Sequence, residues 1–161
     1  MEIHIRKLTA ADDLSAVLSL CKAFFAEYKT HHEELFDTDD LRDEHLSERF
    51  LDSITSENRS TIIAFVDDAI VGYASIAVRD QPDFYKVKHV GRISGLMVEP
   101  AFRRQGIATL LLREARRWFQ KKAVEYFTVY TATANTPAVE FYRRCGMQPL
   151  HTTLIGKTTQ E

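Results

Sequence analysis

The stretch from Leu96 to Ala108 constrains the fold more than any other part of the sequence. An apolar strand ends near Pro100, a basic loop with Arg103 and Arg104 follows, and a helical pattern begins at Gly106. The first turn of a helix carries unpaired N–H groups and the positive end of the helix dipole, and both favour phosphate. Because glycine also lets the backbone approach a ligand closely, the stretch predicts a pyrophosphate-binding loop.

A plain alternative for this loop is a strand-to-helix connection whose arginines are solvated. The pattern Arg-x-x-Gly-x-Ala is weak by itself, so the loop alone leaves both interpretations open. Two other phosphate motifs are excluded. No Gly-Lys-Ser/Thr follows, as a Walker loop requires, and two of the three glycines of the dinucleotide fingerprint are missing.

Hydrophobic periodicity predicts the other elements of the chain. Helices are expected where apolar residues recur at helical spacing, and strands where short apolar runs are bounded by polar turns. The expected strands cover residues 3–6, 61–66, 70–78, 89–98 and 124–130, with a last strand or hairpin over 147–157. The expected helices cover residues 14–28, 41–54, 106–122 and 137–144.

This order of elements predicts an α/β fold, β-α-α-β-β-β-α-β-α-β-β, with helices on both faces of a mixed, mostly antiparallel sheet. The three central strands should form an antiparallel meander. The unit from residue 89 to 130 should be parallel and right-handed, since a helix connects its two strands. A length of 161 residues without a Pro/Gly-rich linker indicates a single domain over 1–161.

Charge and cysteine content narrow the classes of function. A net charge of -2 supplies no basic field for nucleic acid or for an anionic membrane. Cys21 and Cys145 lie far apart without metal-ligand spacing, which favours buried free thiols and no metal site. The N-terminal segment alternates in polarity instead of forming a leader-like apolar run, so a cytoplasmic location is expected.

Two motifs at a fixed separation identify a family. The first comprises Leu96, Val98, Pro100, Arg103, Gly106 and Ala108, and the second comprises Asn135, Ala138, Phe141, Tyr142, Cys145, Gly146 and Met147. In these residues the chain resembles the GNAT superfamily of N-acetyltransferases. That family carries L-x-V-x-P before a (Q/R)-x-x-G-x-(G/A) loop, and further on an asparagine, A-x-x-F-Y and a C/L-G-F/M end.

The resemblance implies acetyl-CoA as co-substrate and a set of residues that bind it. The pantetheine arm would pair with a strand edge, the loop N–H groups would hold the pyrophosphate, and an asparagine and a tyrosine would lie near the thioester. The residues implied are Leu96, Met97 and Val98 on the strand, then Arg103, Arg104, Gln105, Gly106, Ile107, Ala108 and Thr109, and finally Asn135 and Tyr142.

The residues also suggest how acetyl transfer would proceed. No Ser/His/Asp or Cys/His pattern supplies a nucleophile, which favours direct attack by a primary amine of a small molecule or peptide in a ternary complex. Tyr142 is the expected general acid for the leaving thiolate, although an amphipathic helix also accommodates a tyrosine in its core. Thr136 before Pro137 is expected to cap the last helix, which would leave the Asn135 amide for the ligand.

The general base and the acceptor stay open. Arg92 lies where some members of the family have a catalytic glutamate. Other titratable candidates are Glu27, His31, His32, Glu33, Glu34, Asp83, Tyr85, His89 and Glu99. Tyr28, His31 and Tyr85 are candidates for binding the acceptor, and Phe84 with Tyr85 for a homodimer contact.

Three alternatives complete the expectations. The acidic segment 33–40 is either a rim that attracts a cationic amine or a solvated loop at a helix start. A non-catalytic acyl-CoA sensor with the same fold is the alternative to an enzyme. A nucleotide-binding module is a weaker one, because no P-loop lysine is present.

Overall fold

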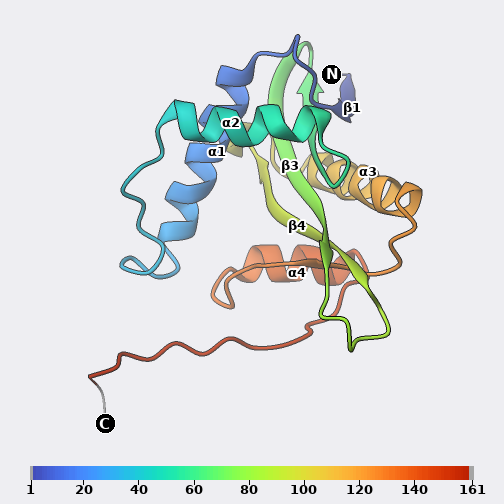
Figure 1. Cartoon of the computed structure of the whole chain (residues 1–161). Helices are drawn as coiled ribbons and strands as arrows, with labels where there is room; N and C mark the ends of the chain where they lie inside the picture. The colour runs from blue at the N-terminus through green and yellow to red at the C-terminus, as the bar shows by residue number, and fades with distance from the viewer. Residues whose placement is uncertain (1, 160–161) are drawn as a thin grey trace.

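A five-stranded sheet in the order β1-β2-β3-β4-β5 organises the computed structural model, which describes residues 2–159 (Figure 1). The strands are β1 (Ile3–Lys7), β2 (Arg59–Val66), β3 (Ala69–Asp80), β4 (His89–Val98) and β5 (Phe127–Val129). The helices are α1 (Leu14–Lys29), α2 (Asp43–Thr55), α3 (Ile107–Lys121) and α4 (Thr136–Arg144), with a 3₁₀ turn η1 (Pro100–Phe102). Strands β1 to β4 pair antiparallel and β5 pairs parallel to β4, which confirms the predicted fold class.

Two hydrophobic cores lie on opposite faces of the sheet. The first, the α3-face core, is built from strand residues such as Ile62, Ala74 and Ile93 together with Leu111 and Phe119 of α3. The second, the α1/α2-face core, has its members on the two N-terminal helices and alternate strand positions, among them Val17, Leu18, Leu46, Phe50, Ile63 and Tyr73. Period-two alternation along the strands sends neighbouring residues to the two cores. No helix within residues 2–159 has the length and apolar character needed to cross a membrane.

The hairpin between β2 and β3 forms as predicted, without a glycine in its turn. Asp67 and Asp68 occupy the turn with φ values of 46° and 70°. Both angles lie in the left-handed region, which aspartate tolerates better than most residues because its short side chain bonds locally. Two successive residues of this kind suit the turn types that match strand twist.

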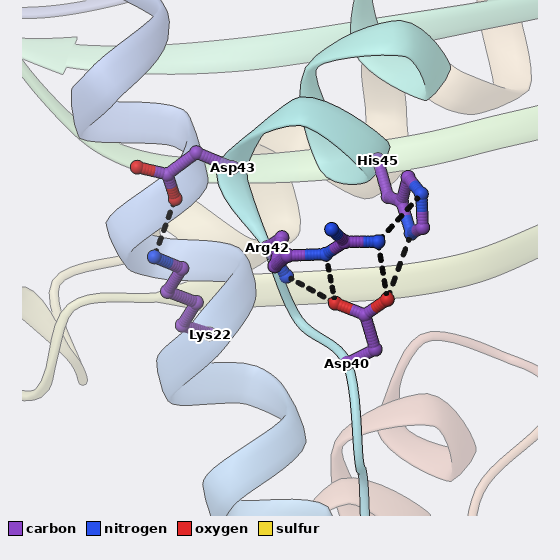
Figure 2. Close-up of polar contacts among 5 residues, drawn as sticks. All are labelled: Lys22, Asp40, Arg42, Asp43 and His45. Atoms are coloured by element: carbon purple, nitrogen blue, oxygen red, sulfur yellow. Dashed lines mark hydrogen bonds and ion pairs between the residues drawn. The ribbon is translucent and has the colours of Figure 1, made fainter.

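Ion pairs neutralise much of the acidic connection between α1 and α2. Figure 2 shows Lys22 of α1 paired with Asp43 in the first turn of α2, and Asp40 held between Arg42 and His45. Closer to α1, Lys29 Nζ lies 2.8 Å from Asp37 Oδ1. The segment therefore bonds to the protein's own cations, which agrees with the solvated helix-start interpretation of segment 33–40.

The C-terminal segment departs from the prediction. No strand or hairpin forms over residues 147–157, and Figure 1 shows this part of the chain leading away from the sheet. Leu150 and Leu154 are 76% and 88% exposed. A two-stranded hairpin is marginal in water unless a neighbouring element covers its apolar face, and no element of the described residues covers this segment. Strand β5 is likewise shorter than predicted, since it pairs with only three residues of β4.

Candidate active site

The candidate site begins where strands β4 and β5 separate. Their pairing runs only from Gly91 opposite Phe127 to Ile93 opposite Val129. A β-bulge at Ser94 then shifts the register of β4 against β3. Beyond the bulge, the outer edge of β4 from Gly95 to Val98 has no strand partner within residues 2–159. Unpaired backbone groups on such an edge are available to an extended ligand.

The N-terminus of α3 lies directly after this free edge and the η1 turn. Gly106 is its N-cap with φ 84°, and no side chain of the described residues caps the helix. The first-turn N–H groups of Ile107, Ala108 and Thr109 consequently lack intrahelical acceptors. A Cβ added at Gly106 would meet nothing within 4 Å, so the space beside the helix end is open. This geometry fits the predicted phosphate-binding loop.

Arg103 has a different place from the other loop residues. Its Nε donates to the Val98 carbonyl at 2.9 Å, and its Nη2 donates to Glu27 Oε1 at 2.6 Å. Its backbone N–H donates to the Pro100 carbonyl at 3.3 Å. The side chain thus fastens the end of β4 to α1, whereas Arg104 and Gln105 are exposed on the loop.

A small cavity of about 50 Å³ lies beside the free edge of β4. Its lining includes Phe24, Tyr28, Gly95, Leu96, Asn135 and Tyr142. Tyr142 is 9% exposed, and burial raises the pKa of its hydroxyl above the usual range for tyrosine. Thr131, also in the lining, has a buried Oγ1 without a hydrogen-bond partner among residues 2–159. The structure therefore brings together three expected binding residues (Tyr28, Leu96 and Asn135), the expected acid and an unsatisfied hydroxyl.

The helix cap of α4 corrects one prediction. Asn135, and not Thr136, is the N-cap residue, and its Oδ1 accepts from the Ala138 N–H at 3.4 Å. Proline in the first turn remains compatible, because that position needs no N–H. The Nδ2 donor of Asn135 is not used by this cap.

A large cavity of about 300 Å³ adjoins the small cavity. Phe24 and Gly95 line both. The large cavity opens between α1, α2 and the sheet, with Phe50, Ser53 and Tyr73 in its lining. Three arginines also line it: Arg49, Arg59 and Arg79. The sequence motifs did not indicate this cavity, because its lining comes from separate elements that share no local pattern.

The candidate acceptor residues are divided by the structure. Tyr28 lines the small cavity. The His31 ring lies edge-on to the Tyr28 ring, and the two ring centroids are 5.6 Å apart. Tyr85 lies in the loop between β3 and β4, is 50% exposed and lines neither cavity.

Three of the candidate bases have a close polar partner of the opposite kind. Glu27 pairs with Arg103, Glu34 Oε2 lies 3.8 Å from Lys157 Nζ, and His89 Nδ1 lies 2.7 Å from Asp80 Oδ1. Arg92 places its guanidinium 4.1 Å from the centroid of the Tyr130 ring. Its Nε is buried without a hydrogen-bond partner in residues 2–159. The position where some relatives have a carboxylate thus carries a positive charge here.

No group of three or more His, Cys, Asp or Glu side chains within residues 2–159 is arranged to hold a metal ion. The two cysteines are free, with Cys21 buried and Cys145 half-buried.

Comparison with solved structures shows the same fold. The aminoglycoside antibiotic 6'-N-acetyltransferase AAC(6')-Ih from Acinetobacter baumannii superposes with a TM-score of 0.76 at 21% identity, covering 99% of this chain and 100% of that one. AAC(6')-Iy in complex with the bisubstrate analogue CoA-S-monomethyl-acetylneamine has a TM-score of 0.79 at 18% identity, with 99% and 100% covered.

Sequence comparison assigns the family. An aminoglycoside N(6')-acetyltransferase type 1 of Acinetobacter haemolyticus is 27% identical over 88 residues, which are 54% of this chain and 61% of that protein. The chain thus matches less than two thirds of that relative's length. The profile of the acetyltransferase (GNAT) family matches residues 20–147, which include the free edge of β4, the start of α3 and Tyr142. The chain therefore belongs to the acetyltransferase (GNAT) family.

Proposed function

We propose that the protein transfers the acetyl group of acetyl-CoA to a primary amine by direct attack in a ternary complex. The observation that carries this proposal is the continuity of three features: the free edge of β4, the uncapped start of α3, and Tyr142 beside that edge. The family assignment supports it, as do similar structures whose names describe 6'-N-acetyltransferases and CoA complexes.

The binding residues follow from donor and acceptor chemistry. The first-turn N–H groups of α3 and the exposed Arg104 suit the pyrophosphate of the co-substrate. The unpaired edge from Leu96 to Val98 suits the amides of a pantetheine arm, which would add to β4 like a strand. The unsatisfied Thr131 Oγ1 and the Asn135 Nδ2 are further polar groups for that arm. Arg103 acts as a positioning residue, because its Nε holds the Val98 carbonyl.

Acetyl transfer by these groups needs no nucleophile from the protein. The neutral amine nitrogen attacks the thioester carbonyl, and a backbone N–H of the β4 edge stabilises the oxyanion. The C–S bond breaks as the amide forms, and the proton that the amine nitrogen loses passes to water, from which Tyr142 regains the proton that it gives to the thiolate. Tyr142 donates its proton to the departing thiolate. Burial favours this role, because it keeps the hydroxyl protonated.

The test is CoA release from acetyl-CoA over a panel of amines. Tyr142→Phe removes the acid and should lower kcat by about 100-fold or more, with acetyl-CoA affinity unchanged. Tyr126→Phe is the matched control, since Tyr126 is 56% exposed and lines neither cavity. Because the pKa of Tyr142 is raised, its titration should cause no fall in wild-type kcat below about pH 10.

Gly106→Glu tests the phosphate loop separately. A carboxylate at the helix N-terminus repels phosphate, and φ 84° is strained for glutamate, so acetyl-CoA affinity should fall sharply in equilibrium binding. Binding of acetyl-CoA without turnover of any amine would indicate the acyl-CoA sensor. Failure of the wild type to bind acetyl-CoA would overturn the proposed function.

A further inference from the structure

The large cavity is placed to receive the acceptor of the proposed reaction. It meets the small cavity at Phe24 and Gly95, next to the bulge where β4 leaves its regular register. An acceptor in the large cavity would therefore approach the thioester from the side of the sheet covered by α1 and α2. A volume of about 300 Å³ suits a small molecule or the end of a side chain.

The charged residues that line the large cavity are all positive. Arg49 of α2 and the strand residues Arg59 and Arg79 line it, and none of its lining residues is acidic. Arg59 is engaged by Asp52, with Nη1 3.1 Å from Oδ2. Within residues 2–159, no carboxylate lies within 4.0 Å of the guanidinium of Arg49 or Arg79. Two guanidinium groups at the rim are thus left to bind an anion.

The Arg49 charge acts on two buried residues of the cavity lining, Cys21 and Tyr73. Burial raises the pKa of the Cys21 thiol, and the charge of Arg49 opposes that rise. It acts in the same direction on the deeply buried Tyr73 hydroxyl. Because Arg49 lines the same cavity as Cys21 and Tyr73, its guanidinium can also act on a group bound inside that cavity.

Arg79 and Arg92 share this face of the sheet. Tyr73, Ser75, Ala77 and Arg79 alternate along β3 toward the large cavity. Arg92 is the cross-strand partner of Ala77, so its side chain lies on the same face, and its guanidinium stacks on Tyr130 at the small cavity. Positive charge therefore extends from the rim of the large cavity toward the point of acetyl transfer.

We propose that the acceptor is a primary amine that also carries an anionic group, a carboxylate or a phosphate ester, which Arg49 and Arg79 bind. This inference rests on the proposed function and names the acceptor class for that same site. A polycation such as an aminoglycoside would meet the arginines with like charge. In the acidic connection between α1 and α2, Asp37 and Asp40 already pair with Lys29 and Arg42, which reduces the negative charge left to attract a polycation.

The experiment compares kcat/KM for amines that differ only in the anionic group. The carboxylate pairs are glycine with methylamine, β-alanine with ethylamine and γ-aminobutyrate with propylamine. The phosphate pair is O-phosphoethanolamine with ethanolamine, and kanamycin is the polycationic comparison. We expect the anionic member of at least one pair to be favoured by about 10-fold or more, as a charged hydrogen bond allows. The pair that responds distinguishes carboxylate from phosphate.

Arg49→Gln and Arg79→Gln test whether the cavity causes the preference. Each should raise KM for the favoured anionic amine by about 10-fold, and leave its uncharged partner within about twofold. Arg113→Gln makes the same chemical change at an exposed position of α3 on the opposite face, and should leave the preference intact. A preference for uncharged or polycationic amines, or an anion preference indifferent to both substitutions, would overturn the proposal.

Direct binding separates this proposal from the proposed function. γ-Aminobutyrate and O-phosphoethanolamine are titrated into the wild-type protein saturated with CoA, and into the two variants. Binding of either ligand that Arg49→Gln and Arg79→Gln weaken supports the anionic acceptor even when no amine is turned over. Binding of neither ligand to a protein that holds CoA would refute the anionic acceptor and leave the CoA site standing.

Discussion

The two faces of the sheet are built differently. On the α3 face, strand and helix side chains form a continuous apolar core in which Ile93, Leu111 and Phe119 are at most 2% exposed. On the α1/α2 face, the core is interrupted by the large cavity of about 300 Å³, and polar pairs take the place of apolar contacts. Ser53 Oγ and Thr61 Oγ1, both buried there, lie 2.8 Å apart.

The difference indicates that the two faces of the sheet have different roles. A filled face holds the strands and the start of α3 in fixed positions, because close-packed interiors resist small displacements. An open face can admit a ligand, but it forgoes the apolar contacts that would have filled the same volume. Stability should therefore depend more on the α3 face and acceptor choice more on the α1/α2 face.

The largest expected effect compares one phenylalanine from each face. Phe119→Ala removes a ring that is 2% exposed in the α3-face core, and should lower the free energy of unfolding by about 4 kcal/mol. Phe50→Ala enlarges a cavity that already opens to solvent, so the loss should be about 2 kcal/mol. Urea unfolding of both variants measures the difference. Equal losses in the free energy of unfolding would mean that the two faces contribute equally to stability.

A smaller effect is expected where β4 approaches α3. A Cβ added at Gly91 would lie 2.6 Å from Cε1 of Phe119, so Gly91→Ala should overpack the α3-face core and cost about 2 kcal/mol. Gly156→Ala is the matched control, since a Cβ there would meet nothing within 4 Å. Thermal unfolding of both variants tests the contact, and an unchanged melting temperature for Gly91→Ala would show that the strand shifts freely.

The smallest stability effect concerns the hydrogen bonds that Asp12, just before α1, accepts from Arg6 and Thr9. Asp12 accepts from Arg6 Nη1 at 2.8 Å and from the Thr9 N–H at 2.7 Å. The hydrogen bond from Arg6 is the main reason that the pKa of Asp12 lies below its usual range. Asp12→Asn should lower the free energy of unfolding by about 1.5 kcal/mol at neutral pH.

The pH dependence of that loss follows from the direction of the shift. Because the folded-state pKa of Asp12 is lowered, its contribution is fully present above the unfolded pKa of about 3.9, and is lost as the pH falls through the folded value. The stability gap between wild type and Asp12→Asn should therefore narrow in acid unfolding experiments below about pH 4. A gap that stays constant across that range would assign the stabilisation to packing instead of charge.

Local chemistry was sufficient to predict much of the fold and the uncapped helix start after Arg104. Alternation and helical spacing located four helices and five strands, because burial of one face imposes a period on each segment. The glycine at the start of α3 was recognisable because a left-handed N-cap position favours that residue. The failures were also local in origin. Thr136 was preferred over Asn135 as the cap of α4, and the segment after Gly146 has apolar residues that no element within residues 2–159 covers.

The sequence by itself thus determined the element order, the family and the uncapped start of α3 at Gly106, since each depends on neighbours along the chain. Only the tertiary structure brought Arg49 from α2 and Arg79 from the end of β3 to one cavity, and joined that cavity to Tyr142 through Gly95. It also decided that the Arg103 side chain binds Glu27 and Val98. The physical reason is that the charge of a cavity is the sum over residues remote in sequence, and no periodicity or motif along one segment encodes that sum.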